Sequence, residues 1–408
     1  MRILFLNPGG TIGGAERALL DAIAGLRALN RGWSFALITA APGHLIDEVK
    51  ELGASAEVIP FPTAFAAAGD AGVGGPAGDS IALWRLMARL WATSPAIAMY
   101  SKKLARAISD AAPDLVHTNG FKMHVLGAWA TPRQVPLLWH VHDYVRVRPV
   151  MSRLLRLHAR RCATVVANSA SVAGDVLATL GARVPLRTIW NAVNLARFSP
   201  DGPHSDLDAL CRMPAAASGT IRVGLVATMA RWKGHETFVR ALSMLSCDLP
   251  IRGYIIGGPA YQTDGSQYTF EELRASAVRM GIADRLGFTG YLREPAAAMR
   301  SLDIVVHAST APEPFGLVIA EAFACGRAVI ASAAGGAAEI VDSDKTAILH
   351  RPGDAGGLAH KIMRLAADAG LRTRLGIAAH RMATRHFTRE RLAAELTAVY
   401  RRLATAAP

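Results

Sequence analysis

The sequence has few cysteines and no long apolar segment of the kinds that identify a zinc-binding, disulfide-rich or secreted protein. The four cysteines, at positions 162, 211, 247 and 325, have neither the close pairing of a zinc site nor the density of a disulfide-stabilised domain. The opening apolar run, Met1–Leu6, is ended by Asn7-Pro8-Gly9-Gly10 well short of a signal peptide or a membrane span. We therefore expect a cytoplasmic protein whose first apolar run is a strand.

Patterns of metal ligands are missing as well. The 13 histidines do not cluster at ligand spacing, and no Asp-x-Asp pair stands at the end of a predicted strand. We therefore expect no metal and no bound cofactor.

Acidic residues are outnumbered, since 32 Asp and Glu stand against 45 Lys and Arg, for a net charge of +13. Such an excess attracts nucleic acids and anionic membranes. Most of the basic residues are Arg in an Ala-rich chain, so codon bias could supply much of the charge without any partner. A nucleic-acid partner has no support beyond this charge, and we expect none. An anionic membrane surface stays open as a partner.

What the sequence does contain is a regular alternation of short aliphatic runs and amphipathic stretches. With 51% apolar residues, this pattern is typical of parallel strands covered by helices on both faces. The length of 408 residues favours two domains. We therefore expect an α/β protein with two doubly wound, Rossmann-like units. Strands are predicted near 2–7, 34–39, 56–59, 114–118, 137–141, 163–167, 187–190, 221–226, 253–256, 286–288, 303–306 and 328–330.

The predicted division between the two domains lies near residue 195. Residues 199–220 carry three prolines and two glycines without a sustained apolar period, as expected of a linker. We assign residues 1–195 to the first domain and residues 196–385 to the second.

The segment Glu313–Glu321 follows the predicted strand that ends at His307 and opens a helix. Open α/β sheets bind ligands at such strand-to-helix turns. If the helix begins near Phe315, the amides of Phe315, Gly316 and Leu317 lack partners within it, and the positive end of the helix dipole favours a diphosphate there.

The carboxylates of Glu313 and Glu321 are predicted to contact different atoms of a ligand, because Glu321 would lie about 9 Å further along the helix. Glu321 is the only charge in an apolar helical run, where a buried carboxylate requires partners such as ribose hydroxyls. The alternative is that Glu313 only complements a helix N-terminus and that Glu321 pairs with an Arg of the core.

The string around these carboxylates resembles the donor site of the family 4 retaining glycosyltransferases of the GT-B fold. It reads Glu-x7-Glu with Pro-Phe-Gly-Leu inside, followed by Ala-Cys-Gly-Arg-Ala-Val-Ile-Ala and by Gly335–Glu339. The resemblance implies an acceptor-side first domain and a donor-binding second domain that face each other across a cleft. It also implies a C-terminal helix, at about residues 386–408, that crosses back to the first domain.

In that family the first Glu holds hydroxyls of the donor sugar, the amides that follow hold the diphosphate, and the second Glu holds the ribose. The resemblance therefore assigns these roles to Glu313, to Phe315, Gly316 and Leu317, and to Glu321.

Two further segments match phosphate-binding turns of the family. Gly13-Gly14 follows the first predicted strand, like the family's glycine-rich turn. Residues 224–234 resemble the family's Gly-Arg-Leu-x-x-x-Lys-Gly turn, and Lys233 matches the lysine whose charge balances the departing nucleotide diphosphate. The family's Arg falls on Thr228. Arg231 either supplies that missing charge or is a solvated loop residue.

The first domain offers His140 and His142 around the end of the predicted strand 137–141. A histidine at the end of a strand is more often structural than catalytic. The family places a histidine at such a strand end, near the donor sugar, and we assign it to His142, directly before Asp143.

A hydrolase would need two carboxylates that flank one bond, whereas this pair is set to hold a nucleotide-sugar lengthwise, so transfer is favoured. The resemblance implies a retaining, metal-independent hexosyltransferase that acts on a glycan, lipid-linked or small-molecule acceptor. The alternative hypothesis, motivated by Thr228, is a catalytically weak or inactive GT-B protein that binds a nucleotide-sugar or a partner. The predicted catalytic residues are Glu313, His142 and Lys233, and the predicted donor-binding residues are Gly13, Gly14, Arg231, Lys233, Phe315, Gly316, Leu317 and Glu321.

Two basic stretches of the first domain also contain apolar residues. Residues 146–161 hold six Arg among Val and Leu, and residues 84–106 combine Trp84 and Trp91 with Arg and Lys. Cationic helices of this kind lie in membrane interfaces, and lipid-linked acceptors are common in the family. The equal alternative is a set of ordinary amphipathic helices whose Arg side chains face water. The membrane-interface hypothesis predicts peripheral contact with the inner face of the membrane.

Overall fold

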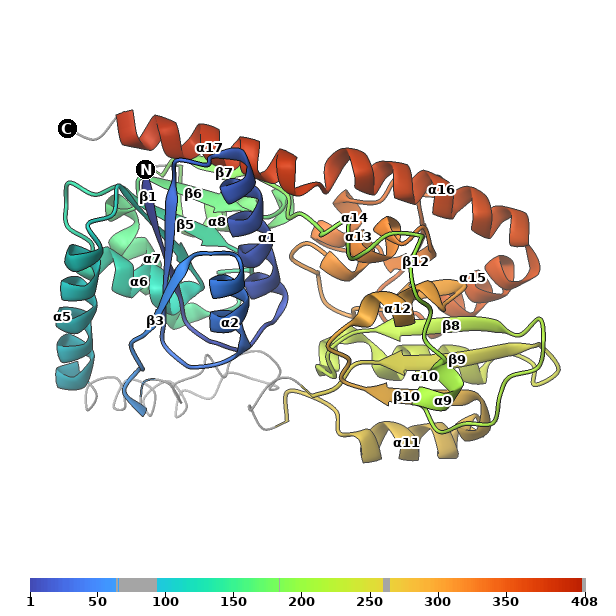
Figure 1. Cartoon of the computed structure of the whole chain (residues 1–408). Helices are drawn as coiled ribbons and strands as arrows, with labels where there is room; N and C mark the ends of the chain where they lie inside the picture. Colours follow the sequence, from blue (N-terminus) through green and yellow to red (C-terminus); the bar gives the residue numbers. More distant parts are fainter. Residues whose placement is uncertain (64, 66–93, 183, 260–264, 406–408) are drawn as a thin grey trace. The chain divides into compact units, whose positions relative to one another are not determined.

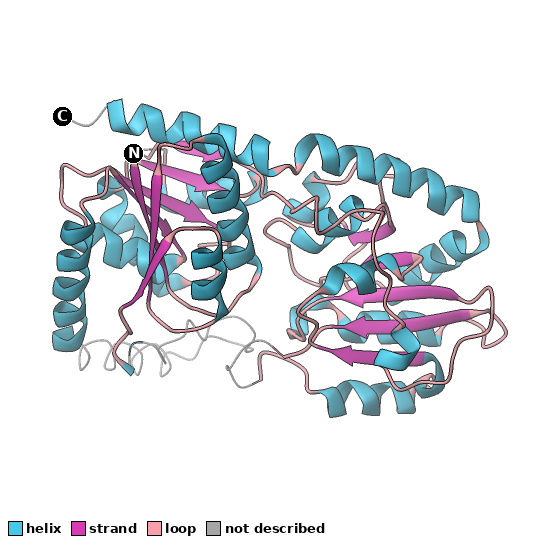
Figure 2. Cartoon of the chain, in the orientation of Figure 1, coloured by secondary structure: helices cyan, strands magenta, loops and turns pink. Residues whose placement is uncertain are grey.

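The structure of the protein is a computed structural model that describes residues 1–63, 65, 94–182, 184–259 and 265–405. It divides into two compact units. Unit 1 holds residues 1–192 together with residues 389–408, and unit 2 holds residues 193–388. Each unit contains one parallel sheet with helices on both of its faces, as Figure 2 shows. The predicted α/β fold class is therefore confirmed.

The sheet of unit 1 has the order β3-β2-β1-β4-β5-β6-β7 (Figure 1). Because apolar side chains fill both faces, β1, β4 and β5 are almost entirely buried, as expected of central parallel strands. The strands are β1 (Arg2–Asn7), β2 (Ser34–Thr39), β3 (Ser55–Val58), β4 (Leu115–Asn119), β5 (Leu137–Val141), β6 (Thr164–Ala167) and β7 (Leu186–Thr188).

Helices cover both faces of this sheet. One face packs against α1 and α17, and the other packs against α5, α6, α7 and α8. The helices of unit 1 are α1 (Gly14–Leu29), α2 (His44–Glu51), α5 (Ser94–Ala111), α6 (Phe121–Ala130), α7 (Pro149–His158), α8 (Ala170–Leu180) and α17 (Arg389–Thr405).

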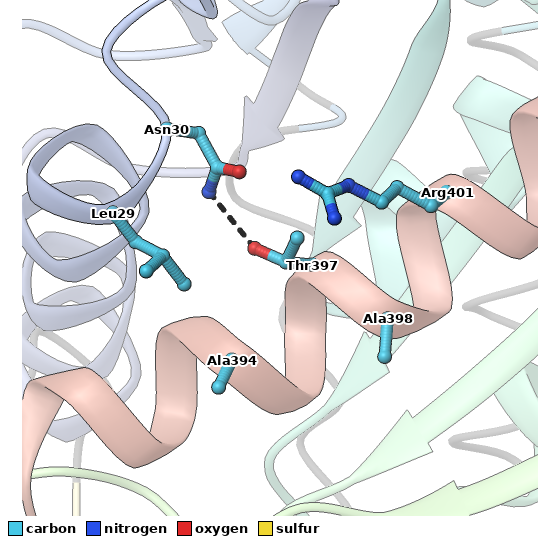
Figure 3. A pocket seen from close by; sticks show the side chains of 6 residues that line it. All are labelled: Leu29, Asn30, Ala394, Thr397, Ala398 and Arg401. Carbon is cyan, nitrogen blue, oxygen red and sulfur yellow. Dashed lines mark hydrogen bonds between the residues drawn. The ribbon is translucent and has the colours of Figure 1, made fainter.

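Helix α17 belongs to unit 1 although it ends the described chain. Leu392, Leu396 and Tyr400 recur on one face of the helix and are buried against the core of unit 1. Gly25 of α1 allows this approach, because a Cβ there would lie 2.5 Å from the carbonyl oxygen of Arg389. Figure 3 shows the far end of the contact, where Asn30 Nδ2 donates to Thr397 Oγ1 at 2.9 Å.

The sheet of unit 2 has the order β10-β9-β8-β11-β12-β13. Its strands are β8 (Ile221–Val226), β9 (Ile251–Ile256), β10 (Leu286–Gly290), β11 (Ile304–His307), β12 (Ala328–Ser332) and β13 (Ile348–His350). Its helices are α9 (Leu207–Leu210), α10 (His235–Ser243), α11 (Phe270–Arg279), α12 (Pro295–Arg300), α13 (Leu317–Ala324), α14 (Gly336–Glu339), α15 (Ala355–Ala367) and α16 (Ala369–His386). The sequence did not predict β13.

Within the described ranges, no helix combines the length and the apolar character that crossing a bilayer requires.

Candidate functional site

A largely buried ion pair joins two loops of unit 2. Lys233 ends the 3-10 turn after β8, and Glu313 lies in the loop between β11 and α13. Nζ of Lys233 donates to Oε1 and Oε2 of Glu313 at 2.8 and 2.9 Å. The two side chains are only 17% and 10% exposed. The structure thus brings together two predicted site residues from distant parts of the sequence.

A glycine lets these loops approach each other. Gly234 has φ 77°, and a Cβ on it would lie 1.9 Å from the carbonyl oxygen of Ala308. The amide of Thr310 donates to the carbonyl of Trp232 at 2.8 Å. Because only glycine tolerates both the conformation and the contact, Gly234 fixes where Lys233 leaves the backbone.

Two residues that the sequence analysis missed hold Glu313 in place. Nε2 of His307 lies 3.1 Å from Oε2 of Glu313, and the Ser309 hydroxyl donates to the same oxygen at 2.8 Å. The amide of Ser332 donates to Nδ1 of His307 at 3.4 Å. This contact places the histidine proton on Nε2, where it is donated to the carboxylate. A polar residue at the last position of an apolar strand was the available signal.

The Glu313 carboxyl is ionised despite its surroundings. Burial acts to raise its pKa, but the charge of Lys233 and the hydrogen bonds from His307 and Lys233 outweigh burial and hold the pKa well below the usual range. The pair is therefore a fixed charge pair at neutral pH.

Helix α13 begins at Leu317 rather than near Phe315, so the predicted start was wrong. The reason is Gly316, whose φ of 92° is left-handed and precedes the first helical residue. Glu321 consequently lies about one turn along the helix, and it is half-buried rather than buried. The first amides of the helix still lack partners within it, so an anion-binding end follows directly after Glu313.

The turn before α14 is joined to the same loop. The amide of Gly336 donates to the carbonyl of Glu313 at 2.7 Å, and a Cβ on Gly336 would lie 2.2 Å from the carbonyl oxygen of Pro314. The glycine pair at 335–336 therefore supports the backbone of the Glu313 loop.

Arg231 has other partners in the structure. Its guanidinium pairs with Glu272 at 2.7 Å, donates to the carbonyl of Gly265 at 2.9 Å and lies 4.5 Å from the centre of the Tyr268 ring. Thr228 is half-buried. A donor-binding role for Arg231 stays a prediction, and it would require the guanidinium to give up the contact with Glu272.

In unit 1, Gly13 and Gly14 lie exposed at the start of α1. Gly13 is the N-cap, and its amide donates to Oε2 of Glu16 at 3.1 Å. Desolvation of Glu16 raises its pKa, although contacts with Asn7 and with backbone amides oppose that shift. Within the described part of the chain, a Cβ built on Gly14 would meet no atom within 4 Å apart from its chain neighbours and the backbone of its own helix, which leaves room for a ligand there.

His140 and His142 lie at the carboxyl end of β5 with their ring centroids 4.0 Å apart. Nδ1 and Nε2 of His142 and Nε2 of His140 are buried atoms without a hydrogen-bond partner among the described residues. Burial lowers the pKa of His142 to about 4, and burial together with the neighbouring histidines lowers that of His140 well below its usual value. Both rings are therefore neutral.

Among the described residues, no group of three or more His, Cys, Asp or Glu is placed to hold a metal ion. The four cysteines are all unpaired.

Comparisons with known proteins identify the family of this chain and agree with its fold. The family described as "Glycosyltransferase Family 4" matches residues 12–197, and "Glycosyl transferases group 1" matches residues 220–368. D-inositol 3-phosphate glycosyltransferase of Jonesia denitrificans is 31% identical over 319 residues, which cover 72% of this chain and 73% of that protein. The lipopolysaccharide core biosynthesis mannosyltransferase LpcC of Rhizobium leguminosarum is 28% identical over 297 residues, covering 68% and 82%.

Among solved structures, Anabaena Alr3699/HepE in complex with UDP-glucose matches with a TM-score of 0.77 and 25% identity. The match covers 98% of this chain and 100% of that one.

Proposed function

Because this chain belongs to glycosyltransferase family 4 and has the GT-B fold, we propose that it is a retaining hexosyltransferase. The donor is a nucleotide-diphosphate sugar, and the acceptor is a glycan, a lipid-linked sugar or a small molecule. The observation that carries the proposal is the Lys233–Glu313 pair, whose Glu313 lies in the loop that leads into the N-terminus of α13. A largely buried cation, a fixed carboxylate and the first amides of a helix together match a diphosphate joined to a sugar.

In the proposed mechanism, Lys233 and the first amides of α13 stabilise the negative charge that grows on the leaving diphosphate. Their fixed charges take the place of a divalent cation, so the reaction is proposed to be metal-independent. Glu313 accepts hydrogen bonds from hydroxyls of the transferred sugar, and Glu321 binds the ribose. The acceptor oxygen attacks from the face that the diphosphate leaves, and the departing phosphate oxygen takes the acceptor proton.

Unit 1 is proposed to supply the acceptor side of the reaction. Gly14 leaves room for a phosphate or hydroxyl near the start of α1, and His142 offers the transferred sugar a ring nitrogen that has no partner among the residues the structure describes. These assignments come from the family resemblance, and the local geometry of unit 1 supports them.

The purified protein is expected to bind one nucleotide-sugar in preference to the others. Thermal-shift screening against UDP-, GDP-, ADP- and CMP-sugars should identify the donor through a rise in the unfolding midpoint. Incubation of that donor with candidate acceptors should then release the nucleoside diphosphate together with a glycosylated product of retained anomeric configuration. Binding without turnover across the acceptor panel would favour the catalytically inactive alternative, and an inverted product would refute retention.

We also propose that helices α5, α6 and α7 of unit 1 contact an anionic membrane on its cytoplasmic side. These helices pack side by side on one face of the sheet. They expose large apolar residues that the core does not use, namely Met99 at 70%, Trp129 at 47% and Leu157 at 74%. The exposed bases Lys102, Lys103, Arg106, Arg153 and Arg160 lie on α5, on α7 and directly after α7. Trp84, Arg85, Arg89 and Trp91 lie outside the described residues.

Not every predicted base is available for this contact. Arg146 pairs with Asp175, Arg148 pairs with Asp143, and Arg161 donates to the carbonyl oxygens of Thr131, Pro132 and Val135. These three Arg side chains have partners within unit 1, so the proposal rests on the remaining exposed residues.

The wild-type protein is expected to float with vesicles that contain anionic lipid at low salt. The double variant Arg153→Glu/Arg160→Glu should lose at least tenfold in partitioning, because each basic residue near such a surface contributes about 1 kcal/mol. The matched control, Arg381→Glu/Arg385→Glu on α16, changes the same charge in unit 2 and should float like the wild type. Equal loss in both double variants would show that net charge alone drives binding, and would contradict a specific surface.

A further inference from the structure

A line of buried polar side chains crosses unit 1 from α17 to the carboxyl end of β5. The Tyr400 hydroxyl lies 2.5 Å from Nδ1 of His117 on β4. Nε2 of His117 lies 3.2 Å from Nδ1 of His140 on β5. The His140 ring in turn packs against His142. Tyr400, His117 and His140 are at most 2% exposed, so water does not compete for these contacts.

The hydrogen bonds in this line favour one order of donors and acceptors. Burial lowers the pKa of His117 to about 3, so His117, like His140, is neutral and carries a single proton. Among the described residues, the Tyr400 hydroxyl has no acceptor other than Nδ1 of His117. If Tyr400 accepted instead, its own buried proton would be left unpaired at a substantial cost in free energy. Tyr400 therefore donates to His117, and His117 donates from Nε2 to His140.

This arrangement determines the protonation of the other ring nitrogen of His140, Nε2. Since Nδ1 of His140 accepts from His117, the proton of His140 is on Nε2. This N–H is buried and has no partner in the described part of the chain. It lies at the carboxyl end of a central parallel strand, which is where such sheets bind their ligands. A ligand oxygen would satisfy it.

We propose that Tyr400 and His117 are positioning residues that fix the proton of His140 on Nε2. His140 then donates this hydrogen bond to a hydroxyl or phosphate oxygen of the bound nucleotide-sugar, beside His142. The inference rests on the proposed function for the identity of the ligand. The tautomer itself depends only on the structure of unit 1.

The packing of α17 on unit 1 holds Tyr400 in position to contact His117. Thr397, less than one turn before Tyr400, accepts the hydrogen bond from Asn30 that Figure 3 draws. The rings of Trp33 and Tyr400 lie 6.2 Å apart with an interplanar angle of 25°. The last helix therefore sets the hydrogen-bonding state of a residue at the ligand-binding edge of the sheet.

The test is the substitution Tyr400→Phe, which keeps the ring and removes the hydroxyl. Long-range nitrogen–proton NMR of protein labelled with ¹⁵N-histidine distinguishes the two tautomers of each ring, and His140 is assigned from the signal missing in His140→Gln. Wild-type His140 is expected to show a protonated Nε2. In Tyr400→Phe it should show the other tautomer or a mixture. An unchanged tautomer in Tyr400→Phe would overturn the relay, whatever the enzyme does with nucleotide-sugars.

Kinetics test the second half of the proposal. Tyr400→Phe should lower kcat/KM about tenfold, the effect of one neutral hydrogen bond. The matched control Tyr254→Phe removes another buried phenol hydroxyl, which donates to Asp208 in unit 2, and should leave the His140 tautomer unchanged. In a His140→Gln background, where the amide N–H needs no tautomer, Tyr400→Phe should cost less than twofold. A tenfold loss that persists there would overturn the role of His140.

Discussion

Replacing Lys233 by Met is expected to lower kcat/KM by about 10²–10³, which is the usual effect of removing one fixed donor from a developing negative charge. The lysine charge lies in a site that is only 17% exposed, so solvent cannot replace it. Most of the loss should fall on kcat, because the charge on the leaving diphosphate is greatest in the transition state. Steady-state rates of nucleotide release with the donor identified by thermal shift provide the measurement.

Two variants control this experiment. Lys345→Met removes an exposed lysine that pairs with Asp342 at the surface of unit 2, and its kcat/KM should stay within twofold of wild type. Arg231→Met tests the residue predicted to replace the family's Arg at Thr228. Because the Arg231 side chain is 44% exposed, against 17% for Lys233, solvent screens its charge more strongly, and we expect a loss smaller than that of Lys233→Met. Wild-type kinetics in Lys233→Met would remove this lysine from the mechanism.

The strands of both sheets were predictable because each depends on a local property. A run such as Ile3-Leu4-Phe5-Leu6 is apolar on both of its faces, and the structure buries both. The short strand β13 was missed, because three residues are too few to show a period. The start of α13 was misplaced for a related reason. The sequence shows a glycine at 316, but only the backbone shows that its φ is positive.

The partners within the site depend on tertiary contacts that no local pattern contains. Lys233 and Glu313 are 80 residues apart, and only the family resemblance placed them together before the structure did. His307 and Ser309 precede Glu313 by six and four residues in the sequence, but their hydrogen bonds depend on how the loop after β11 folds back. Tyr400 and His117, 283 residues apart, meet only because α17 docks on unit 1.

In unit 1 the structure adds His140 to His142 as a candidate ligand-binding residue. The sequence analysis favoured His142, which lies at the end of the predicted strand directly before Asp143. Among the described residues, both nitrogens of His142 lack a hydrogen-bond partner, whereas His140 has one nitrogen in contact with His117 and one without a partner. A side chain whose proton is already placed binds a ligand with less loss of freedom. The two histidines are therefore expected to act together at the end of β5.

Glu313→Gln is expected to lower both activity and stability. The amide keeps the shape of the side chain, but its nitrogen cannot accept hydrogen bonds from Lys233, His307 or Ser309. Breaking a largely buried pair on one side leaves the lysine charge uncompensated, so we expect a loss of about 2 kcal/mol, or roughly 5 °C in the unfolding midpoint of unit 2 at pH 7. Sugar transfer should fall at least 10²-fold, because Glu313 would no longer position Lys233 or the sugar hydroxyls, and a misplacement of about 1 Å can cost 10² in rate.

The pH dependence of this stability loss distinguishes the charge from the packing. The folded pKa of Glu313 lies below that of the unfolded chain, which is about 4.3 for Glu. Its stabilising contribution is therefore fully present above about pH 4.3 and is lost as the pH falls toward the folded value. Wild type and Glu313→Gln should differ most at neutral pH and converge in acid, when midpoints are measured by calorimetry across that range.

The exposed pair of Asp344 with Arg364 provides the control, because Asp344→Asn should shift the midpoint by less than about 1 °C. A gap between wild type and Glu313→Gln that stays constant from pH 7 to pH 3 would mean that shape, not charge, makes Glu313 important to the fold.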